Sequence, residues 1–221
     1  MEAIQVDAGK VLLINKPLTW TSFDVVNKLR YKLKTKKIGH AGTLDPLATG
    51  LLIICVGKMT KRIDEFMGQE KEYTGKFVLG KTTPSFDLET EISEGKDITH
   101  LTDEMIQKAV LPFIGKISQL PPMHSAIKVG GKRAYQFARR GEEVLLAPRE
   151  IEVREFEITS IALPEVNFRI ACSKGTYIRS LARDLGNSLG VGAYLASLCR
   201  TRIGTFTLQE ALEVADVEPH G

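Results

Sequence analysis

Hydrophobic residues along the chain follow two different periods. In several segments they run continuously or occupy every second position between Gly, Pro or charged residues, a pattern typical of β-strands. In one such segment Tyr73 and Phe77 alternate with polar neighbours, as expected of a half-buried strand. The predicted strands are Lys10–Pro17, Gly50–Gly57, Lys71–Gly80, Ile151–Leu163, Val166–Ser173 and Tyr194–Thr207.

Other segments have the helical period. Thr21 and Asp24 have the spacing of a capping box, and apolar residues then recur every third or fourth position up to Leu33, which predicts a helix over about Ser22–Leu33. A second amphipathic helix is predicted from Thr176. Its apolar face comprises Ile178, Leu181, Ala182, Leu185 and Leu189. Shorter helices are predicted over Thr60–Met67, within Thr102–Gly115, through Ala138 to a stop at Gly141, and from Thr207 onward.

The order of these elements indicates the fold class. Strands and helices are interspersed without regular βαβ repetition, so we predict an α+β fold with a mixed sheet flanked by helices. The polar segment Lys81–Asp97 is predicted to be a loop, and Gly130 with Gly131 a turn. No internal repeat or Pro/Gly-rich linker divides the chain. We therefore predict a single domain over residues 1–221, with an insertion at approximately 120–150.

Composition narrows the class of protein. The 221 residues are 43% hydrophobic and 26% charged, which is ordinary for a globular protein with a sizeable core. The N-terminal segment lacks a signal-peptide pattern, and the longest apolar run, Leu51–Val56, is too short to cross a bilayer. We expect a cytoplasmic protein. Its cysteines, Cys55, Cys172 and Cys199, occur singly, so we expect buried, reduced thiols.

Positive charge is concentrated in one segment although the net charge is only +3. The cations of this basic segment are Lys28, Arg30, Lys32, Lys34, Lys36 and Lys37. Such residues near a helix C-terminus complement the helix dipole, and a run of charges is often only a solvated face. They are equally suited to binding the phosphates of a nucleic acid. The pattern leaves both interpretations open.

One carboxylate lies in an unusual context. The stretch "GHAGTLDPLATGLL" places Asp45 between a loop rich in Gly and Thr and the apolar run that follows Pro46. An Asp before a Pro often only caps a turn. However, the chain has no phosphate-binding loop, zinc-ligand spacing or serine-hydrolase motif, and its histidines, His40, His100, His124 and His220, are scattered. Asp45, acting as an acid without a metal ion, a phosphate-binding loop or a serine-hydrolase triad, is the remaining catalytic candidate.

Several motifs occur together in a characteristic order. They are "NKPLTWTSFDVV", "GHAGTLDPLATGLL", "KEYTGKFVLG", "PPMHSAIKVGGKRAYQFARRG" and "SKGTYIRSLARDLG". The chain resembles TruB-type tRNA pseudouridine synthases in these motifs, from about Lys10 to Gly204. The resemblance implies the pseudouridine synthase fold, whose central sheet is largely antiparallel, with an inserted segment that grips RNA. It also implies isomerisation of a uridine in the T loop of tRNA, at position 55, by a monomer that binds the T stem-loop.

This reaction suits a single acid. The N-glycosidic bond must break, the uracil must turn, C5 must bond to the sugar, and the C5 proton must leave. No redox or phosphoryl step occurs, so no cofactor is expected. An aspartate can act as nucleophile on the uracil ring or on the anomeric carbon, and the sequence leaves both routes open.

The resemblance also assigns roles to individual residues. It implies that Asp45 is the nucleophile, that Arg179 is its cationic partner, and that Tyr177 lies against the reacting base, where it could take part in the C5 proton transfer. Tyr73 is implied to stack on the flipped uracil, and stacking would recover part of the cost of unstacking the target. The other implied substrate contacts are His40, Lys16 and Leu198, although a Lys-Pro that ends a strand also has an adequate structural explanation.

Two features depart from the family pattern. The stretch "KTTPSFDLETE" differs from the commoner "TDTxDxxG", and we predict that a C-terminal PUA-type RNA-binding domain is absent. Two alternative functions are therefore considered. A non-catalytic module that binds and remodels tRNA could dispense with Asp45 and Arg179. The catalytic subunit of an RNA-guided pseudouridine synthase would need additional segments for its partners.

Overall fold

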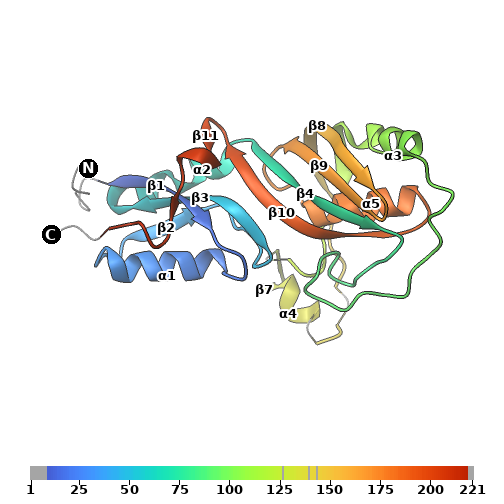
Figure 1. The fold of residues 1–221 in the computed structure, drawn as a ribbon. Coiled ribbons are helices and arrows are strands. Elements are labelled where there is room, and N and C mark those ends of the chain that lie inside the picture. Colours follow the sequence, from blue (N-terminus) through green and yellow to red (C-terminus); the bar gives the residue numbers. More distant parts are fainter. Residues whose placement is uncertain (1–8, 126, 139, 143, 219–221) are drawn as a thin grey trace. The chain divides into compact units, whose positions relative to one another are not determined.

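A computed structural model describes residues 9–125, 127–138, 140–142 and 144–218 (Figure 1). The chain forms two compact units, which are described separately below. Unit 1 comprises Met1–Thr74 and Leu198–Gly221, and unit 2 comprises Gly75–Ser197. Strands β4 (Lys71–Leu79) and β10 (Ala193–Ile203) contribute residues to both units.

Unit 1 is built on one end of a mixed sheet. Its strand order is β12-β1-β3-β10-β4, in which β1 is Lys10–Lys16, β3 is Ala48–Val56 and β12 is Leu212–Glu213. The short strands β2 (Ile38–Ala41) and β11 (Phe206–Thr207) pair with β3 and β10. Strands β1 and β3 are antiparallel, whereas β3 and β10 are parallel. A 3-10 turn, η1 (Gly57–Arg62), leads into α2 (Ile63–Gly68).

Helix α1 (Ser22–Lys32) covers one face of this sheet (Figure 1). The predicted capping box is present, because the Thr21 hydroxyl accepts from the Asp24 main-chain N–H and the Asp24 carboxylate accepts from that of Thr21. The buried face of the helix packs against β1 and β3. The residues of this core cluster include Val25, Val26, Leu29, Leu12, Ile14, Leu52 and Ile54. The apolar residues that recur with helical period in α1 and those of the continuous apolar run in β3 therefore pack into one core.

Unit 2 has the strand order β10-β4-β9-β8-β5. Strands β5 (Gly115–Gln119), β8 (Arg149–Ala162) and β9 (Glu165–Cys172) are successively antiparallel. The remaining elements are α3 (Asp103–Ala109), η2 (Leu111–Phe113), the hairpin β6 (Lys128–Val129) and β7 (Lys132–Arg133), α4 (Ala134–Ala138) and α5 (Ile178–Ser188). In the core, the rings of Phe77 and Phe168 stack with centroids 4.1 Å apart.

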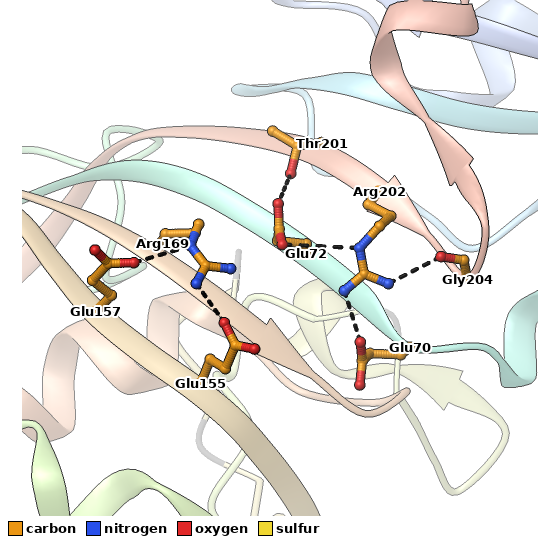
Figure 2. A network of polar contacts seen from close by, with 8 residues as sticks. All are labelled: Glu70, Glu72, Glu155, Glu157, Arg169, Thr201, Arg202 and Gly204. Carbon is orange, nitrogen blue, oxygen red and sulfur yellow. Dashed lines mark hydrogen bonds and ion pairs between the residues drawn. The ribbon is translucent and has the colours of Figure 1, made fainter.

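Polar cross-strand pairs lie on the sheet within each unit (Figure 2). In unit 1 the Arg202 guanidinium contacts Glu70 at 2.7 Å and Glu72 at 3.8 Å, and it also donates to the Gly204 carbonyl. In unit 2 the Arg169 guanidinium pairs with Glu155 and Glu157. Partly exposed pairs of this kind contribute less than about 1 kcal/mol each, so they support strand pairing without dominating stability.

The predicted fold class is confirmed, and most predicted elements lie where the pattern places them. The loop at 81–97 contains no helix, and its one strand-like contact is a bridge between Asp87 and Leu195. Cys55 and Cys172 are buried free thiols as expected, whereas Cys199 is only half-buried. Within the part of the chain that the structure describes, every helix is too short or too polar to cross a membrane.

The C-terminal predictions were partly wrong. The strand predicted to run to Thr207 ends at Ile203, because the chain reverses at Gly204, which has a φ of 55°, and returns as antiparallel β11. The helix predicted from Thr207 is a single 3-10 turn, η3 (Leu208–Glu210). Its capping box is present, but the chain then enters β12 and pairs with β1.

Two other helix starts also differ from the prediction. The segment from Thr60 begins in the 3-10 turn, so the α-helix starts only at Ile63. Helix α5 starts at Ile178 with Tyr177 as its N-cap. Thr176 does not cap it, because its hydroxyl donates to the Ser173 carbonyl instead.

Gly75 tests the packing of unit 2. A Cβ at this position would lie 2.7 Å from Cζ of Phe168 and closer still to the main-chain oxygen of Ser197. We expect Gly75→Ala to lower the free energy of unfolding by about 1–3 kcal/mol, because neither neighbour is a flexible side-chain end. Urea denaturation measures the change. Gly68→Ala is the matched control: a Cβ there has no neighbour within 4 Å, and it should change stability by less than about 0.5 kcal/mol.

Candidate functional site

Asp45 lies in the loop between β2 and β3, here called the aspartate loop (Gly42–Leu47). Gly42 begins the loop with a φ of +90°, a conformation that favours glycine. The main-chain oxygen of Asp45 accepts from the Ala48 N–H at 3.0 Å, which closes a tight turn over Pro46. Asp45 itself is half-buried. Its main chain is therefore fixed, while part of the residue remains accessible to a substrate.

The first sequence motif holds this loop in place. The Ser22 hydroxyl accepts from the Leu44 N–H at 2.8 Å and donates to the Leu44 carbonyl at 3.1 Å. The Thr19 N–H donates to the Pro46 carbonyl at 2.8 Å. Both neighbours of Asp45 in the chain are thus hydrogen-bonded to the segment that leads into α1.

Lys16 is a third support. Its side chain is fully buried, and its ammonium donates to the carbonyls of Pro17 (2.9 Å), Trp20 (2.6 Å) and Pro46 (3.4 Å). Burial lowers the pKa of Lys16 to about 8, with the charge of Arg200 acting in the same direction and that of Asp45 opposing it. The predicted substrate contact Lys16 therefore directs its ammonium at the main chain around the aspartate loop.

His40 and Leu198 lie on the strands next to this loop. His40 is in β2 opposite Ile54, and burial lowers the pKa of its imidazole, with Arg200 adding to the effect. Leu198 is half-buried in β10, where it pairs with Ala48, and its carbonyl accepts from the Thr49 hydroxyl at 3.4 Å. Unit 1 therefore brings both predicted contacts to strands that flank Asp45.

Tyr73 also belongs to unit 1, on β4. Its side chain is 9% exposed, on the buried side of the predicted alternation. Its neighbour Glu72 lies on the polar side and accepts from the Thr201 hydroxyl at 2.9 Å. Successive side chains of a strand point to opposite faces, so Tyr73 lies on the face of β4 opposite to Glu72, which Figure 2 labels.

Arg179 and Tyr177 belong to unit 2, at the start of α5. Arg179 is 4% exposed, and its Nε lies 3.5 Å from the carboxylate of Asp87, which is 5% exposed. Its terminal nitrogens donate to the carbonyls of His124 (2.9 Å) and Ser85 (3.3 Å). Because a buried guanidinium with several directional partners has little freedom, this side chain is held in one orientation.

The main chain of Tyr177 is fixed by a buried amide. The Gln119 side chain accepts from the Tyr177 N–H at 2.8 Å and donates to the Tyr177 carbonyl at 3.1 Å. Gln119 is only 1% exposed, so this reciprocal pair is shielded from water. It satisfies an N–H at the start of α5 and sets the direction in which the helix begins.

Sequence reasoning missed some of these residues. Asp87 lies in the loop that departs from the family pattern, where no local sequence feature indicates its pairing with Arg179. The hydroxyls of Thr83 and Ser85 both donate to the Asp87 carbonyl, at 2.6 and 3.2 Å, and so fix the loop beside Arg179. Gln119 and Ser22 gave no signal, because their partners are main-chain groups of distant segments.

Comparisons with known proteins agree with the motifs. Residues 30–178 match the family model described as "TruB family pseudouridylate synthase (N terminal domain)". The chain is 54% identical over 217 residues to tRNA pseudouridine synthase B of Parabacteroides distasonis, covering 96% of this chain and 92% of that protein. It is also 54% identical to the protein of the same name from Flavobacterium johnsoniae, with 93% of each chain covered.

Solved structures show the same fold. The chain is similar to one chain of a Cbf5-Nop10-Gar1 complex, with a TM-score of 0.75 and 30% identity. The match covers 96% of this chain but only 54% of that one. A structure of an H/ACA RNP bound to a substrate RNA containing 2'-deoxyuridine matches with a TM-score of 0.71 and 27% identity.

The pKa of Lys16 gives a test of its burial. The unfolded chain binds this proton more tightly than the folded protein, so protonation opposes folding below pH 8, and this penalty disappears as the pH rises to 10.5. We therefore expect the stability of the wild type, relative to Lys16→Met, to increase between pH 8 and 10.5. Urea denaturation of both proteins across this range measures the difference. A constant difference would contradict the lowered pKa.

Proposed function

Because the chain belongs to the TruB family of pseudouridylate synthases, we propose that it isomerises uridine 55 in the T loop of tRNA, with Asp45 as the nucleophile. It is a tRNA pseudouridine synthase, an isomerase, as its relatives over nearly the whole chain indicate. The observation that carries the catalytic assignment is the aspartate loop. Its main chain is hydrogen-bonded on both sides of Asp45, and Asp45 itself is half-buried.

Asp45 would act by forming a transient bond to the substrate. Its carboxylate attacks either the uracil ring or the anomeric carbon, the N1–C1′ bond breaks, and the base turns. C5 then bonds to C1′, the carboxylate leaves, and the proton on C5 is removed while N1 gains one. Dividing one difficult step into easier ones is the advantage of a nucleophile, and a fixed loop places its carboxylate near the reacting atom.

Arg179 is proposed as the cationic partner that keeps this carboxylate ionised. Support comes from its own surroundings, since its bonds to Asp87, Ser85 and His124 hold a permanently charged group in one orientation. A cation held in this way lowers the free energy of a nearby carboxylate without reorganising during the reaction. Asp87 is then a positioning residue for Arg179.

The aromatic residues would hold the target uridine. We assign Tyr73 to stacking on the flipped base and Tyr177 to contact with the reacting base and transfer of the C5 proton. The Gln119 amide supports the second role, because it fixes the main chain from which the Tyr177 ring extends. His40 and Leu198 are proposed as further contacts with the RNA, and Lys16 as a support of the aspartate loop.

The basic segment is proposed to contact phosphates. The side chains of Lys28, Lys34, Lys36 and Lys37 are exposed. The other two cations have partners within the protein: Lys32 donates to the carbonyls of Val214 and Ala215, and Arg30 lies over the Phe23 ring at 5.8 Å. The exposed cations are therefore the ones available to RNA. We further propose that the protein acts as a monomer in the cytoplasm on the T stem-loop.

A guide-dependent function is the second candidate, because the fold also matches a chain of the Cbf5-Nop10-Gar1 complex. Identity is lower there, 30% against 54% for the tRNA enzymes. The protein alone should therefore release tritium from C5-labelled uridine in a tRNA transcript. A requirement for added protein or guide RNA would favour the second candidate.

Asp45→Asn tests the nucleophile. The substitution is nearly isosteric but removes the attacking oxygen anion, so we expect tritium release to stop while the Kd for tRNA stays within a few-fold of the wild-type value. Filter binding and the release assay measure the two quantities. Substantial turnover by the Asp45→Asn protein, with the substitution verified by mass spectrometry, would exclude Asp45 as the nucleophile.

The basic segment is tested by salt dependence. Neutralising Lys34 and Lys36 together should weaken tRNA binding and flatten the slope of log K against log salt by roughly 0.7–0.9 for each phosphate that the protein no longer neutralises. Lys32→Gln is the matched control, because its ammonium already bonds main-chain carbonyls and its removal should leave the slope unchanged. Equal slopes for all three proteins would show that these lysines form only a solvated face.

A further inference from the structure

Arg200 bonds the main chain at two places, the start of the aspartate loop and β3, the strand that follows the loop. Its side chain is 1% exposed. Nε donates to the Leu51 carbonyl at 2.8 Å, after Asp45 in the chain. The terminal nitrogens donate to the carbonyls of Gly42 at 3.1 Å and Thr43 at 3.5 Å, before Asp45. One side chain thus ties the first two residues of the loop to β3, the strand that follows it.

Burial of this guanidinium is costly, which indicates that its bonds are needed. Removing a charge from water has a large desolvation penalty, and an apolar side chain would pack here at lower cost. Arg200 donates its hydrogen bonds to main-chain carbonyls. These bonds offset the desolvation penalty and fix the position of the loop backbone. Its planar fork of donors reaches carbonyls of the loop and of β3 at once.

The main chain of Arg200 is itself fixed against β3, the strand that follows the loop. Arg200 pairs with Gly50 where β10 runs parallel to β3. A Cβ on Gly50 would lie 2.7 Å from the Arg200 nitrogen and closer still to its carbonyl oxygen, so the two backbones are in direct contact. The guanidinium therefore extends from a rigid base only a few residues from Asp45.

The side chains that bond the loop contact different parts of its main chain. Ser22 and Lys16 bond the immediate neighbours of Asp45, whereas Arg200 bonds the base of the loop. We propose that Arg200 is a positioning residue for Asp45, because its guanidinium holds the start of the aspartate loop against β3 and hence sets the place of the carboxylate. The inference rests on the proposed role of Asp45 as the nucleophile.

Arg200→Lys tests this role because it keeps the charge and removes the fork. We expect the single-turnover rate on tRNA to fall about 100-fold, the size of loss that a displacement of a reacting group by about 1 Å can cause. The Kd for tRNA should stay within about threefold of the wild-type value, since the substitution affects the chemical step. If Arg200 had a purely structural role, its substitution would lower the melting temperature, but it would not reduce the single-turnover rate while leaving the Kd for tRNA unchanged.

Arg202→Lys is the matched control on the same strand. Arg202 bonds Glu70 and the Gly204 carbonyl, away from the loop, so its replacement should leave the single-turnover rate within about threefold of wild type. An Arg200→Lys protein that is folded by circular dichroism and keeps its rate within the same limit would overturn the proposal. An unchanged rate with weakened binding would also overturn it.

Gly42→Ala perturbs the loop from the opposite side. Its φ of +90° is strained for alanine, whereas the added Cβ would lie 3.6 Å from the Arg200 guanidinium and so has room. If Arg200 acts through the loop, its substitution should cost less in the Gly42→Ala background than in wild type, because both changes displace the same element. Fully multiplicative decreases in rate would show that Arg200 acts elsewhere.

Two further variants complete the test of this proposal. Asp45→Asn, measured in the same assay, distinguishes failure of this inference from failure of the proposed function, since an active Asp45→Asn protein would remove the premise. Arg200→Gln, which keeps a planar donor without charge, replaces Arg200→Lys if the latter does not fold. If neither variant folds, Arg200 serves stability alone and the proposal fails.

Discussion

The main-chain carbonyls of the aspartate loop must be satisfied although the loop belongs to no helix or strand. Buried polar groups of the backbone need partners, and here side chains from distant segments supply them. Ser22, Lys16 and Arg200 reach the loop from the start of α1, the end of β1 and from β10. The catalytic candidate, Asp45, is thus positioned by hydrogen bonds to the backbone on either side of it.

In unit 2, buried side chains also bond main-chain groups near candidate catalytic residues. Gln119 bonds the main chain of Tyr177, and Arg179 bonds the carbonyls of Ser85 and His124 beside its ion pair with Asp87. A lone buried cation would be expensive, so the carboxylate and carbonyls offset its desolvation. Both units therefore hold candidate catalytic residues through buried polar contacts, which tolerate little displacement.

The surface contrasts with these supports. The exposed lysines of the basic segment have no need of a fixed geometry, because attraction to phosphate depends mainly on charge and distance. The cross-strand pairs of Arg169 and Arg202 are partly exposed and stabilise the sheet only modestly (Figure 2). A fixed backbone around the candidate catalytic residues suits an enzyme that must act on one base. Exposed lysine side chains that can move suit the binding of a large RNA.

Sequence alone determined the periodic elements and the identity of the main candidates. The capping box of α1, the continuous apolar run of β3 and the alternation of β4 are local signals, and the motif around Asp45 is specific enough to indicate the family. The helix predicted from Thr207 was overridden by the pairing of β12 with the distant strand β1, whereas β10 ends early because the chain reverses at Gly204 and pairs locally with β11. Asp87, Gln119 and Arg200 became visible only in the tertiary structure. Their partners are main-chain atoms or charges far away in the sequence, and only folding brings these groups within hydrogen-bond distance.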